Sequence, residues 1–144
     1  MGWDQWMLLR VSNKSSADTL KLKFPNAGDH WGYPFAGTGD LSDRIEISYA
    51  EIEDKDIAPH ASYAYGHTGR ENAPSGLEGT VDILEKGTGG GEAQRIAQIS
   101  YNCPWDGSNT FVISDVSAGW DVKSSGEDFE GNALGSITIE VSRT

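Results

Sequence analysis

The sequence predicts an all-β protein, a single-domain β-sandwich of two antiparallel sheets that extends over residues 1–144 and holds about eight strands or more. Three observations indicate this fold class. Short segments alternate apolar and polar residues with a period of two, which is typical of strands with one buried face. The 18 glycines gather between these segments, where turns are expected. No window of helical length keeps a 3.6-residue period, although residues 92–99 could be mistaken for a short helix.

The first four predicted strands precede the longest glycine cluster. Residues 6–11 alternate weakly and are predicted to be covered on both faces. In residues 19–24 leucine and phenylalanine alternate with lysine, and in residues 44–49 isoleucine alternates with charged residues. Residues 80–83 repeat this pattern. Each of these three alternating segments is therefore predicted to be a half-buried strand.

The last four predicted strands follow the glycine cluster at residues 87–91. Residues 95–101 alternate weakly, residues 109–116 and 136–141 alternate strictly, and residues 119–123 form a shorter candidate. Because all these strands are short and are separated by turn residues, we expect a sandwich whose functional loops gather at its ends.

The composition is acidic, since 22 Asp and Glu against 11 Lys and Arg give a formal net charge of −11. Such a surface should repel phosphate backbones, so we expect no nucleic-acid partner and a zwitterionic or neutral headgroup on any membrane target. The longest apolar run, Met7 to Leu9, is far too short for a membrane-spanning helix. The N-terminus lacks a basic leader, so we expect a soluble protein, cytoplasmic or secreted without a Sec signal. The single cysteine, Cys103, is expected to be a buried thiol.

No sequence pattern indicates catalysis, a cofactor or a metal. His30, His60 and His67 are too far apart for a local metal motif and are expected on the surface or in loops. The acidic residues 51–56 lack the glycine-centred spacing of a calcium loop, and residues 87–92 lack the ending of a phosphate loop. We therefore expect a protein that is not an enzyme, while a hydrolase with paired carboxylates stays open as a third function.

Aromatic residues are the unusual feature of the sequence, with five tryptophans in 144 residues. Trp6, Phe111 and Trp120 lie on predicted strands and are expected in the sandwich interior. Two proline-containing segments, residues 31–35 and 101–105, are predicted to be loops. Exposed rings on such loops suit membrane interfaces and the recognition of cations. The predicted lipid-binding residues are these loop aromatics, a carboxylate that balances a cationic headgroup, and one supporting tryptophan: Trp31, Tyr33, Tyr101, Trp105, Asp106 and Trp6.

Five short motifs occur along nearly the whole chain: Gln5-Trp6, Trp31-Gly32, GLEGTVD at residues 76–82, Cys103-Pro104-Trp105, and GNALGSIT at residues 131–138. In these motifs the sequence resembles the aegerolysin family, small β-sandwich proteins of fungi and bacteria. The Cys-Pro-Trp and Gly-x-Ala-Leu-Gly motifs carry most of the resemblance.

The resemblance implies a protein that binds membrane sphingolipid, either ceramide phosphoethanolamine or sphingomyelin with cholesterol, and is then peripheral on the target membrane. It also implies the docking component of a two-component pore-forming toxin, whose partner carries a membrane-attack-complex/perforin domain. The resemblance adds Ser75 to the predicted lipid-binding residues, because it stands where sphingomyelin-binding relatives carry a glutamate implicated in sensing cholesterol, and Tyr101 replaces a tryptophan. The lipid headgroup therefore stays open, and ceramide phosphoethanolamine would suit an insecticidal role.

A second function from a different class also stays open. A carbohydrate-binding or protein-interaction β-sandwich would use the same aromatic loops to stack on sugar rings or on a partner. The same exposed rings could equally form the interface of a homodimer.

Overall fold

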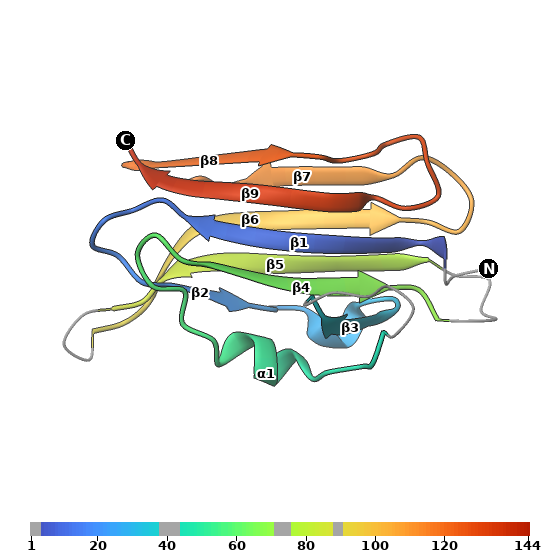
Figure 1. The fold of residues 1–144 in the computed structure, drawn as a ribbon, viewed down its shortest axis with the longest axis horizontal. Coiled ribbons are helices and arrows are strands. Elements are labelled where there is room, and N and C mark those ends of the chain that lie inside the picture. The colour runs from blue at the N-terminus through green and yellow to red at the C-terminus, as the bar shows by residue number, and fades with distance from the viewer. Residues whose placement is uncertain (1–3, 38–43, 71–75, 88–90) are drawn as a thin grey trace.

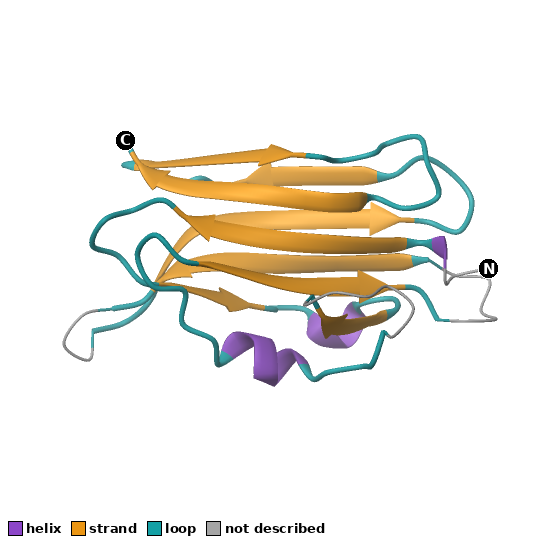
Figure 2. Cartoon of the chain, viewed as in Figure 1, coloured by secondary structure: helices purple, strands orange, loops and turns teal. Residues whose placement is uncertain are grey.

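The computed structural model describes residues 4–37, 44–70, 76–87 and 91–144. Within these ranges the chain forms two stacked β-sheets with a short helix at one side (Figures 1 and 2). The predicted fold class, an all-β sandwich, is confirmed. None of the helices in the described ranges is long and apolar enough to cross a membrane.

The first sheet has five strands. In spatial order they are β3 (Tyr33–Ala36), β4 (Ser62–Thr68), β1 (Trp6–Asn13), β9 (Gly135–Arg143) and β8 (Trp120–Ser125). Neighbouring strands are antiparallel except β1 and β9, which are parallel. This parallel pair is the exception in the described sheets, which are otherwise antiparallel as predicted, and it places the first and the last strand of the chain side by side in the middle of the sheet (Figure 1).

The second sheet has four antiparallel strands. In spatial order they are β2 (Leu20–Lys23), β5 (Leu77–Glu85), β6 (Gln94–Cys103) and β7 (Thr110–Ser114). Inward-facing residues of both sheets make one continuous core, which includes Leu9, Val81, Ile99 and Ile139. Burial of such apolar side chains is the main favourable contribution to the stability of this fold.

The prediction of a strand at residues 44–49 is wrong. Glu46 makes an isolated bridge to Phe35, and the chain then enters helix α1 (Tyr49–Glu53). The Ser48 hydroxyl accepts a hydrogen bond from the backbone N–H of Glu51 at 3.1 Å, which is the geometry of a helix N-cap. This local capping prevails over the alternating pattern of the segment.

Two strands were not foreseen in the sequence. β3 contains Pro34, which lacks a backbone donor and is tolerated here because β3 is the edge strand of its sheet. β4 contains Gly66 and the buried His67, so it does not alternate. Gly66 is required because a Cβ atom there would collide with the ring of Phe35. The residues that break the strand pattern are thus the ones that let β3 and β4 pack closely.

Candidate functional site

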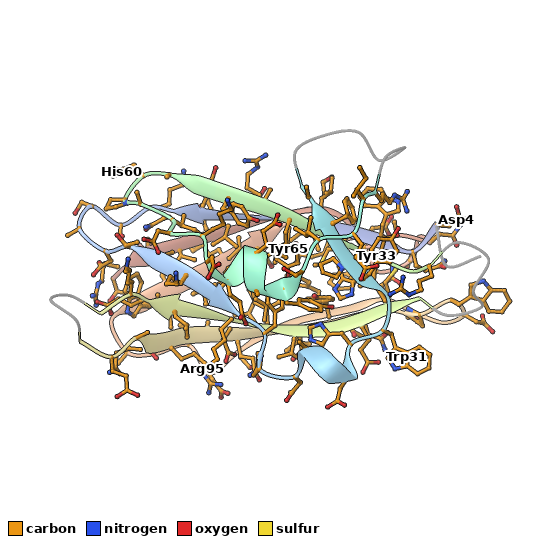
Figure 3. The ribbon with its side chains drawn as sticks, turned by 90° about the horizontal axis from the view of Figure 1, so that it is seen from below. Asp4, Trp31, Tyr33, His60, Tyr65 and Arg95 are labelled. Carbon is orange, nitrogen blue, oxygen red and sulfur yellow. The ribbon has the colours of Figure 1, made fainter. Side chains whose placement is uncertain are left out.

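One end of the sandwich carries a hollow of about 320 Å³. Two exposed tryptophans border it, and its lining comes from the start of β5, the end of β6 and the segments beside them: Trp31, Gly76, Leu77, Glu78, Asn102, Pro104, Trp105 and Asp106. Trp31 is 59% exposed and Trp105 is 48% exposed, so both rings present apolar surface to solvent. In Figure 3 the labelled Trp31 lies toward the end of the molecule opposite His60.

The backbone of Trp31 is fixed to the edge of β5. Trp31 and Glu78 exchange two hydrogen bonds, with N···O distances of 3.0 Å and 3.1 Å, which continue the edge pairing beyond the end of β2. The Nε2 atom of His30 accepts a hydrogen bond from the Thr80 N–H at 3.0 Å and so takes the place of a further backbone carbonyl. Gly32 has a φ of +85°, and a Cβ atom there would collide with the Thr68 carbonyl. The exposed indole therefore projects from a rigid backbone.

A buried hydrogen-bonded chain lies behind Trp31. The carbonyl oxygen of Trp31 can only accept, so His67 donates its Nε2–H to it at 3.0 Å. The Nδ1 atom of His67 must then accept the hydrogen bond from the Tyr101 hydroxyl at 2.7 Å. The Tyr65 hydroxyl is 3.4 Å from that of Tyr101 and completes the chain by donating to it. These buried polar groups tie the core to the backbone of the exposed tryptophan.

The histidines at this end are neutral. Burial, with a smaller contribution from the adjacent His30 ring, lowers the pKa of His67 to about 3. Burial also lowers the pKa of His30. Because Nε2 of His30 accepts from Thr80, its proton is on Nδ1, which donates to the Tyr49 hydroxyl at 3.0 Å. The prediction that the histidines lie on the surface or in loops is thus wrong for His67, whose side chain is fully buried in β4.

Trp105 is carried by the segment that follows β6. Gly76 packs so closely against the carbonyl of Cys103 that a side chain there would collide with it. The thiol of Cys103 is buried, as predicted, and donates to the carbonyl of Asn132 at 3.0 Å. Burial raises the pKa of this thiol to about 11, which makes Cys103 a structural residue and a poor nucleophile.

A single amide organises the neighbouring loop. The side chain of Asn109 is buried and donates to three backbone carbonyls, those of Asp128 at 2.7 Å, Gly131 at 3.0 Å and Ala133 at 3.2 Å. Phe129 belongs to the same loop and is 46% exposed. The loop between β8 and β9 is therefore held against the connection between β6 and β7.

The electrostatics of the hollow favour cations. Two carboxylates, those of Glu78 and Asp106, line it together with the indoles of Trp31 and Trp105. None of the described residues that line it is Lys, Arg or His. Aromatic faces attract ammonium groups, and carboxylates add a favourable Coulomb interaction. The hollow can thus accept a positively charged headgroup, and its described lining offers no counter-charge for a phosphate.

The structure brings three predicted site residues together: Trp31, Trp105 and Asp106 all line the hollow. Glu78 and Asn102 were not predicted. They are paired across β5 and β6, and cross-strand register is spatial information that a sequence does not state. The sequence feature that could have identified Glu78 is its motif, in which this charged residue follows Leu77, a leucine that faces the core.

The prediction that Tyr101 lies on an exposed loop is wrong. Strand β6 continues to Cys103, and Tyr101 faces the core with 1% of its surface exposed. Tyr33 is also buried, because its hydroxyl donates to the Arg44 carbonyl at 3.1 Å and Arg70 covers its ring. Both tyrosines therefore support the fold from within.

Trp6 is half-buried at the start of β1 and does not line the hollow. The prediction that Trp6 lies in the sandwich interior is wrong, because the next residue, Met7, faces the core instead. Phe111 and Trp120 are buried, as predicted. Ser75 lies outside the described residues. Among the described residues, no group of three or more His, Cys, Asp or Glu could hold a metal ion.

Comparisons with known proteins agree with this architecture. The aegerolysin family model matches residues 4–144. Aegerolysin Aa-Pri1 from Cyclocybe aegerita is 31% identical over 140 residues, which cover 96% of this chain and 90% of the relative. Ostreolysin A6 from Pleurotus ostreatus is 28% identical, covering 97% of this chain and 96% of the relative. Asp-hemolysin from Aspergillus fumigatus is 27% identical, covering 96% of this chain and 93% of the relative.

Solved structures share the same fold. A crystal structure of RahU protein in complex with a TRIS molecule superposes with a TM-score of 0.79 at 24% identity, covering 99% of this chain and 97% of that one. A crystal structure of IP-1A from Alcaligenes faecalis superposes with a TM-score of 0.76 at 26% identity, covering 99% of this chain and 94% of that one. Since the family model matches nearly the whole chain, this protein belongs to the aegerolysin family.

Proposed function

We propose that this protein binds sphingolipid membranes through the hollow bordered by Trp31 and Trp105. The observation that carries the proposal is the combination of two exposed indoles and two carboxylates on one rigid end of a sandwich. Indole rings prefer the membrane interface, where one part of the ring is apolar and the N–H remains hydrated. The net charge of −11 disfavours anionic lipids, which leaves zwitterionic headgroups as the target.

The ammonium group of the headgroup is the recognised charge. It would sit between the indole faces, with Glu78 and Asp106 balancing its charge. The unsubstituted ammonium of ceramide phosphoethanolamine can also donate hydrogen bonds to these carboxylates, which the quaternary ammonium of sphingomyelin cannot do. We therefore favour ceramide phosphoethanolamine, with sphingomyelin plus cholesterol as the alternative ligand.

Insertion of the two indole rings supplies only part of the free energy that micromolar membrane binding requires. If each half-exposed indole loses about 100 Å² of exposed surface, each contributes on the order of 2.5 kcal/mol. Two rings then supply about 5 kcal/mol, whereas micromolar affinity requires about 8 kcal/mol. Contacts with the headgroup must provide the rest, so binding should depend on headgroup chemistry as well as on membrane insertion.

The proposed role of the bound protein is to dock a pore-forming partner. The names ostreolysin and Asp-hemolysin of two relatives point to lysis of membranes as the final activity. The described strands are all paired within the two sheets, so we assign the transmembrane part to a separate protein with a membrane-attack-complex/perforin domain. An insecticidal assembly would follow from a preference for ceramide phosphoethanolamine.

Co-flotation with vesicles tests the lipid-binding proposal. We expect binding to phosphatidylcholine vesicles that contain ceramide phosphoethanolamine and no binding to phosphatidylcholine alone. Trp31→Ala and Trp105→Ala should each lower the affinity about tenfold or more while the melting temperature stays nearly unchanged. The matched control is Val116→Ala, because Val116 is 43% exposed but lies near the start of β6, at the opposite end from Trp105.

Absence of binding to vesicles with either sphingolipid would refute the proposal. Equal losses in Trp105→Ala and Val116→Ala would refute the assignment of this end as the binding surface. The docking role is tested by dye release: the protein alone should leave sphingolipid vesicles intact, and addition of its perforin-domain partner should release the dye.

A further inference from the structure

A second hollow, of about 310 Å³, lies on the outer face of the four-stranded sheet. Its lining comes from β5, β6 and β7: Glu78, Gly79, Thr80, Ser100, Tyr101, Asn102, Thr110 and Val112. Glu78 and Asn102 also line the hollow between the tryptophans. The two hollows are therefore adjacent and share one wall.

Strand register explains which side chains face this second hollow. One rung across the sheet contains Glu78, Asn102 and Thr110, and the next contains Thr80, Ser100 and Val112. The residues between these rungs face the core, since Tyr101 and Phe111 are buried. Successive residues of a strand point to opposite faces, so both rungs point outward.

These outward polar groups are free to bind a ligand. Among the described residues, no hydrogen bond engages the side chains of Glu78, Thr80, Ser100, Asn102 or Thr110. The next rung of the same sheet is different, because Gln98 donates to the Asp82 carboxylate at 2.9 Å. The sheet thus satisfies its outer polar side chains in one rung and leaves them open in the two rungs that line the hollow.

The chemistry of the lining indicates a neutral polyol. Three hydroxyls, an amide and a carboxylate offer both donors and acceptors, and no Lys, Arg or His lines the hollow among the described residues. A phosphate would find no counter-charge there. Val112 is 53% exposed and supplies an apolar wall for the C–H face of a sugar ring.

We infer that the second hollow binds a neutral pyranose sugar through the hydroxyls of Thr80, Ser100 and Thr110. The sugar could belong to a glycolipid or be free. The glycolipid form rests on the proposed function, because it requires the tryptophan end to contact a membrane. The two rungs that line the second hollow are two residues apart along each strand, about 7 Å. If the tryptophan end contacts a membrane, the second hollow lies at the height of the headgroup layer, where the sugar of a neighbouring glycolipid projects.

The test compares vesicles of ceramide phosphoethanolamine and phosphatidylcholine with the same vesicles containing glucosylceramide or galactosylceramide. We expect one of these hexosylceramides to raise the affinity about tenfold. The double variant Thr80→Val with Ser100→Val should lose this gain and keep wild-type binding to vesicles without sugar. Thr138→Val is the matched control, since Thr138 is a strand threonine of the other sheet. Melting temperatures verify that all variants fold.

A second arm uses methyl glucoside and methyl galactoside in solution. We expect millimolar sugar to shift the amide resonances of residues 79–81, 99–101 and 110–112. Sugar-induced shifts without any vesicle binding would support the sugar site while the proposed lipid function fails. Binding to ceramide phosphoethanolamine vesicles, with no gain from either hexosylceramide and no shifts, would overturn the sugar site and leave the proposed function standing.

Discussion

Replacing Tyr101 by phenylalanine should destabilise the protein without removing its membrane binding. The Tyr101 hydroxyl donates to Nδ1 of His67 at 2.7 Å, and both side chains are buried. In Tyr101→Phe that nitrogen loses its donor while His67 still donates its other N–H to the Trp31 carbonyl. The variant therefore leaves a buried acceptor unsatisfied.

The magnitude follows from this geometry. An unsatisfied buried acceptor costs about 1–3 kcal/mol, and the 3.4 Å contact to the Tyr65 hydroxyl adds little because it is long. For a domain of this size, that loss corresponds to a fall in melting temperature of about 3–10 °C. The ring itself stays in place, so the core should keep its shape.

Chemical denaturation and thermal unfolding measure the loss, and vesicle co-flotation measures binding. The matched control is Tyr63→Phe, since Tyr63 lies on β4 and its hydroxyl makes no hydrogen bond among the described residues. We expect the control to change the free energy of unfolding by less than about 0.5 kcal/mol. A Tyr101→Phe variant as stable as the wild type would refute the hydrogen-bonded chain. Loss of vesicle binding with unchanged stability would support the original prediction that Tyr101 is a lipid-binding residue.

Other changes should affect the same framework. Asn109→Ala removes three hydrogen bonds to backbone carbonyls, and urea unfolding should show a loss of about 2–4 kcal/mol; a loss under 1 kcal/mol would contradict its role as the organiser of that loop. Because the pKa of His67 is about 3 when folded and near 6.5 when unfolded, this residue should lower the unfolding free energy by about 1.4 kcal/mol per pH unit as the pH drops from 6.5 toward 3, and this loss should be reversed as the pH rises. His67→Gln should remove this contribution and so make the pH dependence of the unfolding free energy shallower; an unchanged pH dependence would speak against a neutral buried His67. Gly66→Ala should destabilise by several kcal/mol through collision with Phe35, and a stable variant would show that β3 can shift.

The alternating pattern was sufficient to predict most of the strands. It worked where one face of a strand is buried and the other is wet, as in Leu20–Lys23 and Gly135–Arg143. It missed β3 and β4 because an edge strand tolerates Pro34, and a closely packed strand requires Gly66. It placed a strand at residues 44–49, where local capping starts a helix instead.

The candidate site was predicted in part for a related reason. Proline marks the start of the segment that exposes Trp105, and Gly32 marks the turn after Trp31, so both rings could be identified as exposed from local chemistry. Tyr101 was misplaced because it stands two residues before Cys-Pro-Trp, although β6 continues through it. The partners Glu78 and Asn102 depend on pairing between strands, which only the folded chain determines.

The central claim, that the end carrying Trp31 and Trp105 faces the membrane, is tested most directly by hydrogen exchange of the wild-type protein with and without ceramide phosphoethanolamine vesicles. We expect bound vesicles to slow amide exchange in residues 30–32 and 105–108 and to leave residues 115–119, beside the start of β6, unchanged. Protection at residues 115–119, with none at residues 30–32 and 105–108, would contradict it.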